Sequence, residues 1–442
     1  MWIVNIFLIC IAVYYTLKLA AIMGTKFLFL IYILFNFAQQ IASIIYLNTG
    51  VFVTELNRTT YYVPKSTPLF IFYTDIFLIM LCYFGKRNKK QYSINNTVIR
   101  STNLSRAFCH GVLILTVGLA LYTLADLVVS GIPMFTDLIT HYNYYSMYST
   151  LPYASTINNW LSISMYLLGF AYVHIDKKYF RICCISLVIF AMVIRILMGF
   201  RMSGLINIPL NFLAIIALLS NVEFKNIRQI LKPKYIILTI GIIISVIAIF
   251  IASTIFNGNA ESVSLGFEVL LNRAFGLGNH LWWAAEADKV TGNDFFGHNL
   301  LKEIGAILTA KSQYDIDTGI YYLMKKYGYS YIVNVDIKHG IRYAATFITT
   351  AVYNWGYFFA IIPITVIARV TIGLINSIER AIKLDKFFQL LLICKIWGTF
   401  STFLIASGTM AEWLNIENYI YFAIYFVLRY AGKNAKFTVG KK

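Results

Sequence analysis

Long apolar stretches alternate with short polar loops along almost the whole chain. An apolar window of about 20 residues is long enough to cross a hydrocarbon core of about 30 Å as a helix. By this criterion the sequence predicts about eleven membrane-spanning helices. The windows lie near residues 1–19, 26–46, 68–85, 107–129, 160–175, 182–199, 204–220, 235–255, 346–370, 387–407 and 417–430.

The composition agrees with this pattern. Hydrophobic residues make up 59% of the 442 positions and charged residues only 13%, a balance that a water-facing surface does not accommodate. We therefore expect an all-α, polytopic membrane protein with a single membrane domain. The first window lacks a basic leading segment and a small-residue cleavage site, which favours a retained helix over a cleaved signal peptide. The six cysteines lie in or beside apolar windows, so we expect no structural disulfide.

The basic residues predict the orientation. Lys and Arg concentrate in the loops 86–106, 174–181, 223–234 and 376–386 and in the tail 431–442. The positive-inside rule places these segments in the cytoplasm. The formal charge of +18 therefore sets topology, and we expect no nucleic acid as a partner. The N-terminus is expected outside and the C-terminus in the cytoplasm.

This orientation divides the chain into three parts. Residues 1–255 are expected to hold the first eight membrane helices. Residues 256–345 form one large segment on the outer face, with short helices of its own. Residues 346–442 hold helices nine to eleven and the basic cytoplasmic tail.

Two arginines interrupt an apolar run. Arg195 and Arg201 occur in VIRILMGFRMSG, residues 193–204, and an arginine in a span costs about 2.5–3.5 kcal/mol on insertion scales. Arg273 and Arg342 are expected near the same outer membrane surface. Four guanidinium groups at one level suit a lipid diphosphate, whose oxygens match the guanidinium fork.

Simpler explanations of these charges remain open. Arg201 taken alone is more typical of a side chain that extends to the membrane interface. Two carboxylates, Asp75 and Asp126, lie in predicted spans, and an ion pair with Arg195 would also explain its position.

The outer segment carries three histidines. His280, His298 and His339 titrate near neutrality, so each is a candidate general base, although a packed or hydrogen-bonded histidine is the commoner situation. His280, Trp282 and Trp283 are also candidate sugar-binding residues, since the tryptophan rings could stack on a sugar face, although tryptophan is common at membrane interfaces regardless of function. The spacing of the histidines does not match a metal site, and we expect no metal or other cofactor.

The chain resembles the Wzy family of O-antigen and oligosaccharide repeat-unit polymerases. The resemblance rests on the multi-span layout with one dominant outer segment late in the chain, on FGHNLLKEIGAIL (296–308) and on ATFITTAVYNWGYFFAIIPITVIARV (345–370). It implies a metal-independent glycosyltransferase of GT-C-like fold in the bacterial inner membrane, involved in lipopolysaccharide or related polysaccharide biosynthesis.

The resemblance also implies substrates and roles. Undecaprenyl-diphosphate-linked oligosaccharides would be donor and acceptor at the periplasmic face, with a flippase and a chain-length regulator as membrane partners. Arg201, Arg273 and Arg342 would hold diphosphates, and His298 or His339 would position or deprotonate the acceptor hydroxyl, with Glu303 as a further candidate base. Two alternatives remain, an O-antigen ligase and a lipid-linked oligosaccharide flippase or other transporter.

Overall fold

The computed structural model is almost entirely helical. It describes residues 2–89, 103–135, 143–199, 202–219, 251, 261–288, 300–309, 319–338, 343, 345–384, 386–407 and 413–439. The all-α fold class predicted by the apolar windows is confirmed in these residues, apart from one two-stranded ribbon.

The chain begins with a helical hairpin. Helix α1 (Trp2–Met23) and helix α2 (Leu28–Leu47) are joined by the tight turn Gly24–Phe27, where Gly24 has a φ of 57° that favours glycine. Lys26 in this turn forms an ion pair with Glu379. This contact fixes the hairpin turn to a helix more than 300 residues later in the chain.

A short ribbon precedes the third helix. Strands β1 (Phe52–Val53) and β2 (Arg58–Thr59) pair in antiparallel register. Helix α3 (Ser66–Lys89) follows and packs along α1. The close approach is visible at Gly85, where an added Cβ would lie 3.2 Å from Ile22 Cγ2.

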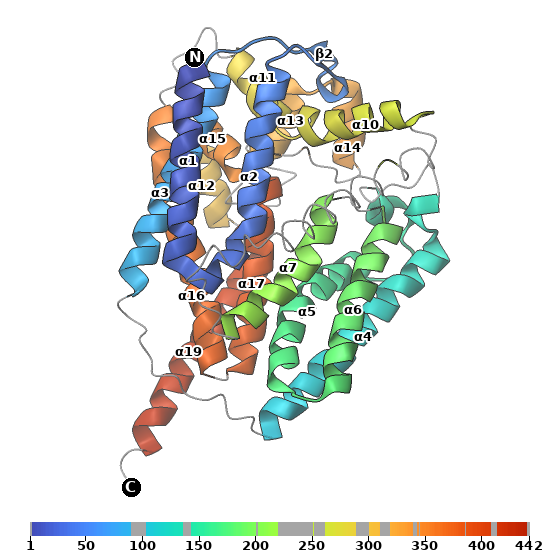
Figure 1. Ribbon diagram of the computed structural model, residues 1–442, viewed down its shortest axis with the longest axis vertical. Coiled ribbons are helices and arrows are strands. Elements are labelled where there is room, and N and C mark those ends of the chain that lie inside the picture. Colours follow the sequence, from blue (N-terminus) through green and yellow to red (C-terminus); the bar gives the residue numbers. More distant parts are fainter. Residues whose placement is uncertain are drawn as a thin grey trace, which may run out of the picture.

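The next four helices form a group of their own, on one side of the molecule (Figure 1). They are α4 (Asn103–Ser130), α5 (Ala154–His174), α6 (Lys178–Leu197) and α7 (Met202–Leu219). Helix α5 is the centre of the group because it contacts the other three.

Short helices make up the described part of residues 256–345, the segment predicted to lie on the outer face and called the outer segment below. They are α10 (Val263–Leu271), α11 (His280–Asp288), α12 (Leu300–Thr309), α13 (Gly319–Tyr327) and α14 (Ser330–Lys338). In Figure 1, α10, α11, α13 and α14 lie with β2 at the same end of the molecule as the N-terminus, and the C-terminus lies at the opposite end.

The last part of the chain departs from the predicted span over residues 346–370. Gly356, with φ 78° and ψ 170°, interrupts the helical backbone inside α15 (Phe347–Phe359), and α16 (Ile361–Lys383) follows. Glycine adopts this conformation readily because it has no Cβ. Helices α17 (Phe387–Thr402) and α19 (Ile416–Val439) complete the fold.

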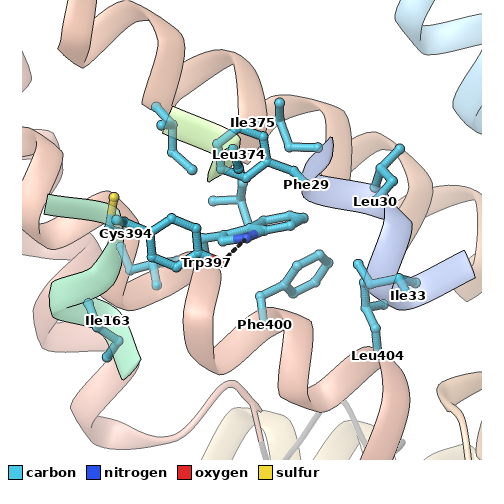
Figure 2. Close-up of a cluster of buried hydrophobic side chains, with 14 of the residues drawn as sticks. Phe29, Leu30, Ile33, Ile163, Leu374, Ile375, Cys394, Trp397, Phe400 and Leu404 are labelled. Atoms are coloured by element: carbon cyan, nitrogen blue, oxygen red, sulfur yellow. Dashed lines mark hydrogen bonds between the residues drawn. The ribbon is translucent and has the colours of Figure 1, made fainter. Parts of the chain in front are cut away.

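A hydrophobic core joins the group of α4 to α7, called the second helix group below, to the remaining long helices, which form the first (Figure 2). The Trp397 side chain on α17 lies at its centre, between Phe29 of α2 and Phe400, and its indole N–H donates to the Tyr166 hydroxyl of α5 at 3.0 Å. A buried Trp whose polar end is bonded combines a large apolar contact with a satisfied donor.

Six stretches of the described chain are long and apolar enough to cross a membrane. They are Trp2–Leu47, Ser66–Arg87, Arg106–Phe135, Lys178–Leu197, Ile361–Lys383 and Phe387–Ile405. These stretches fit a multi-pass membrane protein. The predicted total of about eleven spans is not confirmed, and the window 235–255 falls almost wholly outside the described residues.

The closest helix contact in the second group gives a stability test. A Cβ added to Gly169 on α5 would lie 2.5 Å from the Phe212 carbonyl oxygen on α7. Gly169→Ala should therefore push α5 away from α7 and lower the melting temperature in detergent, at a cost of about 1–3 kcal/mol. Gly118→Ala on α4 is the matched control, because nothing lies within 4 Å of the added Cβ. Equal melting temperatures for both variants would contradict this packing.

Candidate functional site

Helix α11 of the outer segment is buried against the membrane helices. Residues 280–287 are all buried. The Trp282 indole N–H donates to the Ser66 carbonyl at 2.9 Å, and the Trp283 indole N–H donates to the Tyr61 carbonyl at 3.0 Å. The guanidinium of Arg58 lies 5.0 Å from the Trp283 ring centroid, a cation–π contact.

These contacts bear on the sugar-binding role predicted for the two tryptophans. Their side chains are 1% and 0% exposed, so the rings pack inside the protein and offer no open face to a sugar. Trp282 and Trp283 fasten α11 to the segment between α2 and α3. A sugar-binding role for them stays a prediction that would require this contact to open.

His280 is buried at the first residue of α11. Its Nδ1 lies 3.1 Å from the Leu277 carbonyl oxygen, and only N–H can donate there, so the proton sits on Nδ1 and Nε2 carries a lone pair. Burial lowers the pKa of this imidazole to about 4. Nε2 is fully buried and has no hydrogen-bond partner among the described residues. His280 is therefore a neutral imidazole with an unused acceptor.

Other polar atoms without a partner lie on or next to α11 and the two helices that it contacts here, α2 and α15. Within the described part of the chain, Asn279 Nδ2, Thr346 Oγ1, Gln40 Oε1 and Ser43 Oγ are buried without a hydrogen-bond partner. Asn279 and Thr346 come together because the Thr349 hydroxyl, one turn into α15, donates to Asn279 Oδ1 at 3.4 Å.

Gln40 and Ser43 lie on α2, which contacts α11. On α2 they lie between Phe37, whose ring centroid is 6.1 Å from that of Phe347, and Leu47, which packs in one cluster with Trp283. We call Gln40, Ser43, Asn279, His280 and Thr346 the outer polar cluster. Buried polar groups are bonded in the great majority of cases, so this concentration marks a candidate binding site for a polar group or for water.

An aromatic layer closes the membrane side of the outer polar cluster. The ring centroids of Phe77 and Phe347 are 5.1 Å apart, and Phe347 is 6.2 Å from Phe403. All three side chains are buried. The cluster is therefore separated from the deeper part of the helix bundle by apolar rings.

A second set of bonds fixes α11, α15 and α3 to one another. The Tyr357 hydroxyl donates to Glu286 Oε2 at 2.7 Å, and the Tyr73 hydroxyl donates to the Tyr357 carbonyl at 2.7 Å. Tyr357 follows the break at Gly356 directly. Tyr357 therefore links α3, through its carbonyl, to α11, where Glu286, which is 5% exposed, receives a hydroxyl partner.

Arg195 lies inside the second helix group. Its side chain is 6% exposed, and Nη2 donates to the Asn158 carbonyl at 3.3 Å and to the Ser162 hydroxyl, both on α5. Asn211 on α7 donates to the Ser162 carbonyl at 3.1 Å. The guanidinium therefore belongs to a polar contact between α5, α6 and α7.

Tyrosines surround the same guanidinium. Tyr32 and Tyr145 lie close enough to Arg195 to interact electrostatically. A cavity of about 10 Å³ is lined by Tyr32, Asn207, Asn211 and Ser401 among apolar side chains, which is room for about one water. Arg195 is thus placed among neutral hydrogen-bonding groups.

The carboxylate of Asp126 has partners of its own. It accepts hydrogen bonds from the hydroxyls of Tyr144, Ser149 and Ser130 and from the Leu151 amide, at 2.9–3.3 Å. These bonds tie the end of α4 to the segment 143–151. The ion pair with Arg195 that the sequence left open is not needed to explain why Asp126 is buried.

The remaining predicted site residues are not described. Arg201, His298, His339 and Arg342 lie outside the described residues, and Arg273 and Glu303 are described only in their backbone, in a π-helical turn and in α12. The predicted gathering of four guanidinium groups at one level is therefore untested, and the roles of these six residues stay predictions.

Lys395 is a buried cation that the sequence pattern did not single out. Lys395 on α17 is 5% exposed, and its Nζ lies 3.5 Å from the Glu417 carboxylate and 5.1 Å from the Trp160 ring centroid. Its position within LLLICKIWGTF, residues 390–400, was the available signal. Glu417, at the start of α19, supplies the partner that an intramembrane lysine requires.

Comparison with known proteins adds a family without a known function. Residues 313–422 match the model of a family of unknown function, DUF6418. This region includes α13 to α17, Lys395 and Glu417. No curated protein matches the chain, and no solved structure matches it.

The buried histidine gives a pH test. Its pKa is about 4 in the folded protein against an ordinary 6.5, so the unfolded chain binds more protons between these two pH values. Stability should be unaffected by His280 above about pH 6.5 and should fall toward pH 4 by about 3 kcal/mol in total. His280→Asn should flatten this part of a plot of melting temperature against pH. His110→Asn, at an exposed position on α4, should not, and identical plots for both variants would contradict the buried state of His280.

Proposed function

We propose that this protein polymerises undecaprenyl-diphosphate-linked oligosaccharide repeat units by glycosyl transfer at the periplasmic face of the bacterial inner membrane. The product would be O-antigen or a related surface polysaccharide. The observation that supports the proposal most is the state of His280, a neutral imidazole with an unused Nε2 in a buried polar cluster beside the outer segment. A general base needs such a free lone pair at working pH.

The reaction needs a base and a site for the leaving group. An acceptor hydroxyl would give its proton to an imidazole while its oxygen forms the bond to the donor C1. The bond from C1 to the diphosphate oxygen breaks, and undecaprenyl diphosphate leaves with the electron pair. The proton then passes from the imidazole to the departing diphosphate or to water. Cations that are already positioned would stabilise the developing charge without a metal.

Residues of this chain would share these tasks. The candidate bases are His280, His298, His339 and Glu303, and the candidate diphosphate ligands are Arg195, Arg201, Arg273 and Arg342. His280 is 1% exposed, so an acceptor hydroxyl would reach its Nε2 only after α11 and the Tyr343 ring, whose centroid is 5.0 Å away, move apart. Substrate-induced movement of this kind is common in enzymes that exclude water.

A transporter of lipid-linked oligosaccharide is the second candidate. Arg195, Lys395 and Asp75 are all buried within candidate spans, and charged residues in spans often mark a substrate or ion pathway. The outer segment favours the polymerase, because transport of a lipid-linked oligosaccharide across the membrane does not require a large structure on one face.

Glycan analysis in living cells tests the proposal. In cells that lack the chromosomal gene, Arg195→Ala should give single-repeat glycan only, whereas Arg195→Lys should keep part of the long-chain product, because charge is retained and the guanidinium fork is lost. Arg181→Ala, which removes a half-exposed ion pair with Asp176, is the control and should leave chain length unchanged. Gel electrophoresis of surface polysaccharide gives the readout, with membrane levels of each variant checked by immunoblot.

The pattern of products separates the candidates. Single-repeat glycan that still reaches the cell surface favours a polymerase over a flippase and over a ligase. Normal long chains in Arg195→Ala would contradict a role of this arginine in binding diphosphate.

A further inference from the structure

Asp75 is a carboxylate without a partner in the middle of α3. Its side chain is 3% exposed, and both carboxylate oxygens are fully buried with no hydrogen-bond partner among the described residues. It lies nine residues after the first residue of α3, which places it about 14 Å along the helix, close to the middle of a bilayer core. The site is distinct from the outer polar cluster and from the reaction proposed above.

The helix periodicity shows where Asp75 points. Cys82 lies seven residues later on the same face of α3, and its thiol donates to the Tyr15 carbonyl of α1 at 3.4 Å. Gly85 touches Ile22 of α1 one turn further on. Asp75 therefore faces α1. It lies two turns closer to the N-terminus of α3 than the contact that Cys82 makes with α1.

Charged groups on the neighbouring helices are occupied elsewhere. α1 contributes Lys18, which donates to the Tyr14 hydroxyl at 3.3 Å; α16 contributes Arg369, which lies 5.5 Å from the Phe84 ring centroid. α11 contributes Glu286, which accepts from Tyr357, and Asp288, which is exposed at the end of that helix. The other ions of α16, Glu379 and its neighbours, lie at its far end, and α2 and α15 carry no charged side chain.

Among the described residues, an ionised Asp75 has neither a counter-ion nor a hydrogen-bond donor, and the protein interior penalises such a charge strongly. The neutral acid carries no such penalty. We infer that Asp75 is a proton-binding site, which holds its proton while α1 packs against α3 and loosens this contact when the proton leaves. Ionisation would require water or a new partner, and either can enter only if the two helices separate.

Movement at this contact would reach the outer polar cluster. Tyr73, two residues before Asp75, donates to the Tyr357 carbonyl at 2.7 Å, and Tyr357 is bonded to Glu286 of α11. A shift of α3 therefore acts on the junction of α11 and α15. Proton occupancy at Asp75 would in this way set how tightly the outer segment is held.

Two measurements on the whole protein in liposomes test the inference. Dicyclohexylcarbodiimide, an apolar reagent, adds the oxygen of a protonated carboxyl to its central carbon while the acid proton moves to its nitrogen. Peptide mapping by mass spectrometry should find this label on Asp75 at neutral pH and less of it as pH rises. Asp126, which accepts four hydrogen bonds, is the internal control and should stay unlabelled.

Alkylation of the native Cys82 reports on the packing of α1 against α3. A membrane-permeant maleimide should react with Cys82 several-fold faster in wild type than in Asp75→Asn at alkaline pH, and at equal rates in both at low pH, because asparagine mimics the neutral acid permanently. The comparison at each pH removes the effect of thiol ionisation itself. Cys109 and Cys184, both buried in other helices, should react equally in the two proteins.

If either measurement gives a different result, the inference is wrong. An unlabelled Asp75 would mean that the carboxylate is ionised and paired in the membrane. Identical Cys82 rates in wild type and Asp75→Asn at every pH would mean that the proton does not control the α1–α3 contact. Neither measurement involves glycan, so their failure leaves the proposed polymerase untouched, and loss of polymerase activity would not bear on them.

Discussion

A polar group taken away from water needs a partner, and this requirement organises the whole molecule. A helix pairs its own backbone N–H and C=O groups through hydrogen bonds, which is the main reason that membrane-spanning chains are helical. Several of the polar side chains inside the protein find a partner on another helix. Trp397 is bonded to Tyr166, Lys395 to Glu417 and Arg195 to Ser162. Each of these bonds joins two different helices, and the first joins helices that are distant in sequence.

The same requirement makes the exceptions informative. The outer polar cluster and Asp75 hold buried atoms with no hydrogen-bond partner in the described part of the chain, and leaving such a group unpaired costs about 1–3 kcal/mol. Other buried side chains, among them Asn5, Asn158, Tyr343 and Trp413, also carry an atom without a hydrogen-bond partner among the described residues. A ligand, a water or a proton can complete such a group.

The sequence predicted the all-α fold class, whereas the predicted site stays a prediction. Apolar windows specify helices because their length matches the membrane, and the described helices start and end near most of the predicted limits. The break at Gly356 was not predictable from hydropathy, since glycine is common in apolar windows and only the φ of 78° reveals the change of direction.

His280, Trp282 and Trp283 were expected in an outer segment open to sugars, and all three are buried. A short helix such as α11 that packs inward has the same composition as one at the membrane interface, so tertiary contacts decided its place. Arg195 lies deep in an apolar window and is buried, while its part in binding diphosphate stays a prediction.

Reconstituted polymerisation tests the central claim most directly. The purified protein in liposomes would be given undecaprenyl-diphosphate-linked repeat units on its outer side, and the glycans would be sized by mass spectrometry. We expect chains that grow by whole repeat units with one undecaprenyl diphosphate released per addition, and the same growth with a metal chelator present. Repeat units that cross the membrane without becoming longer would contradict a polymerase and identify a transporter.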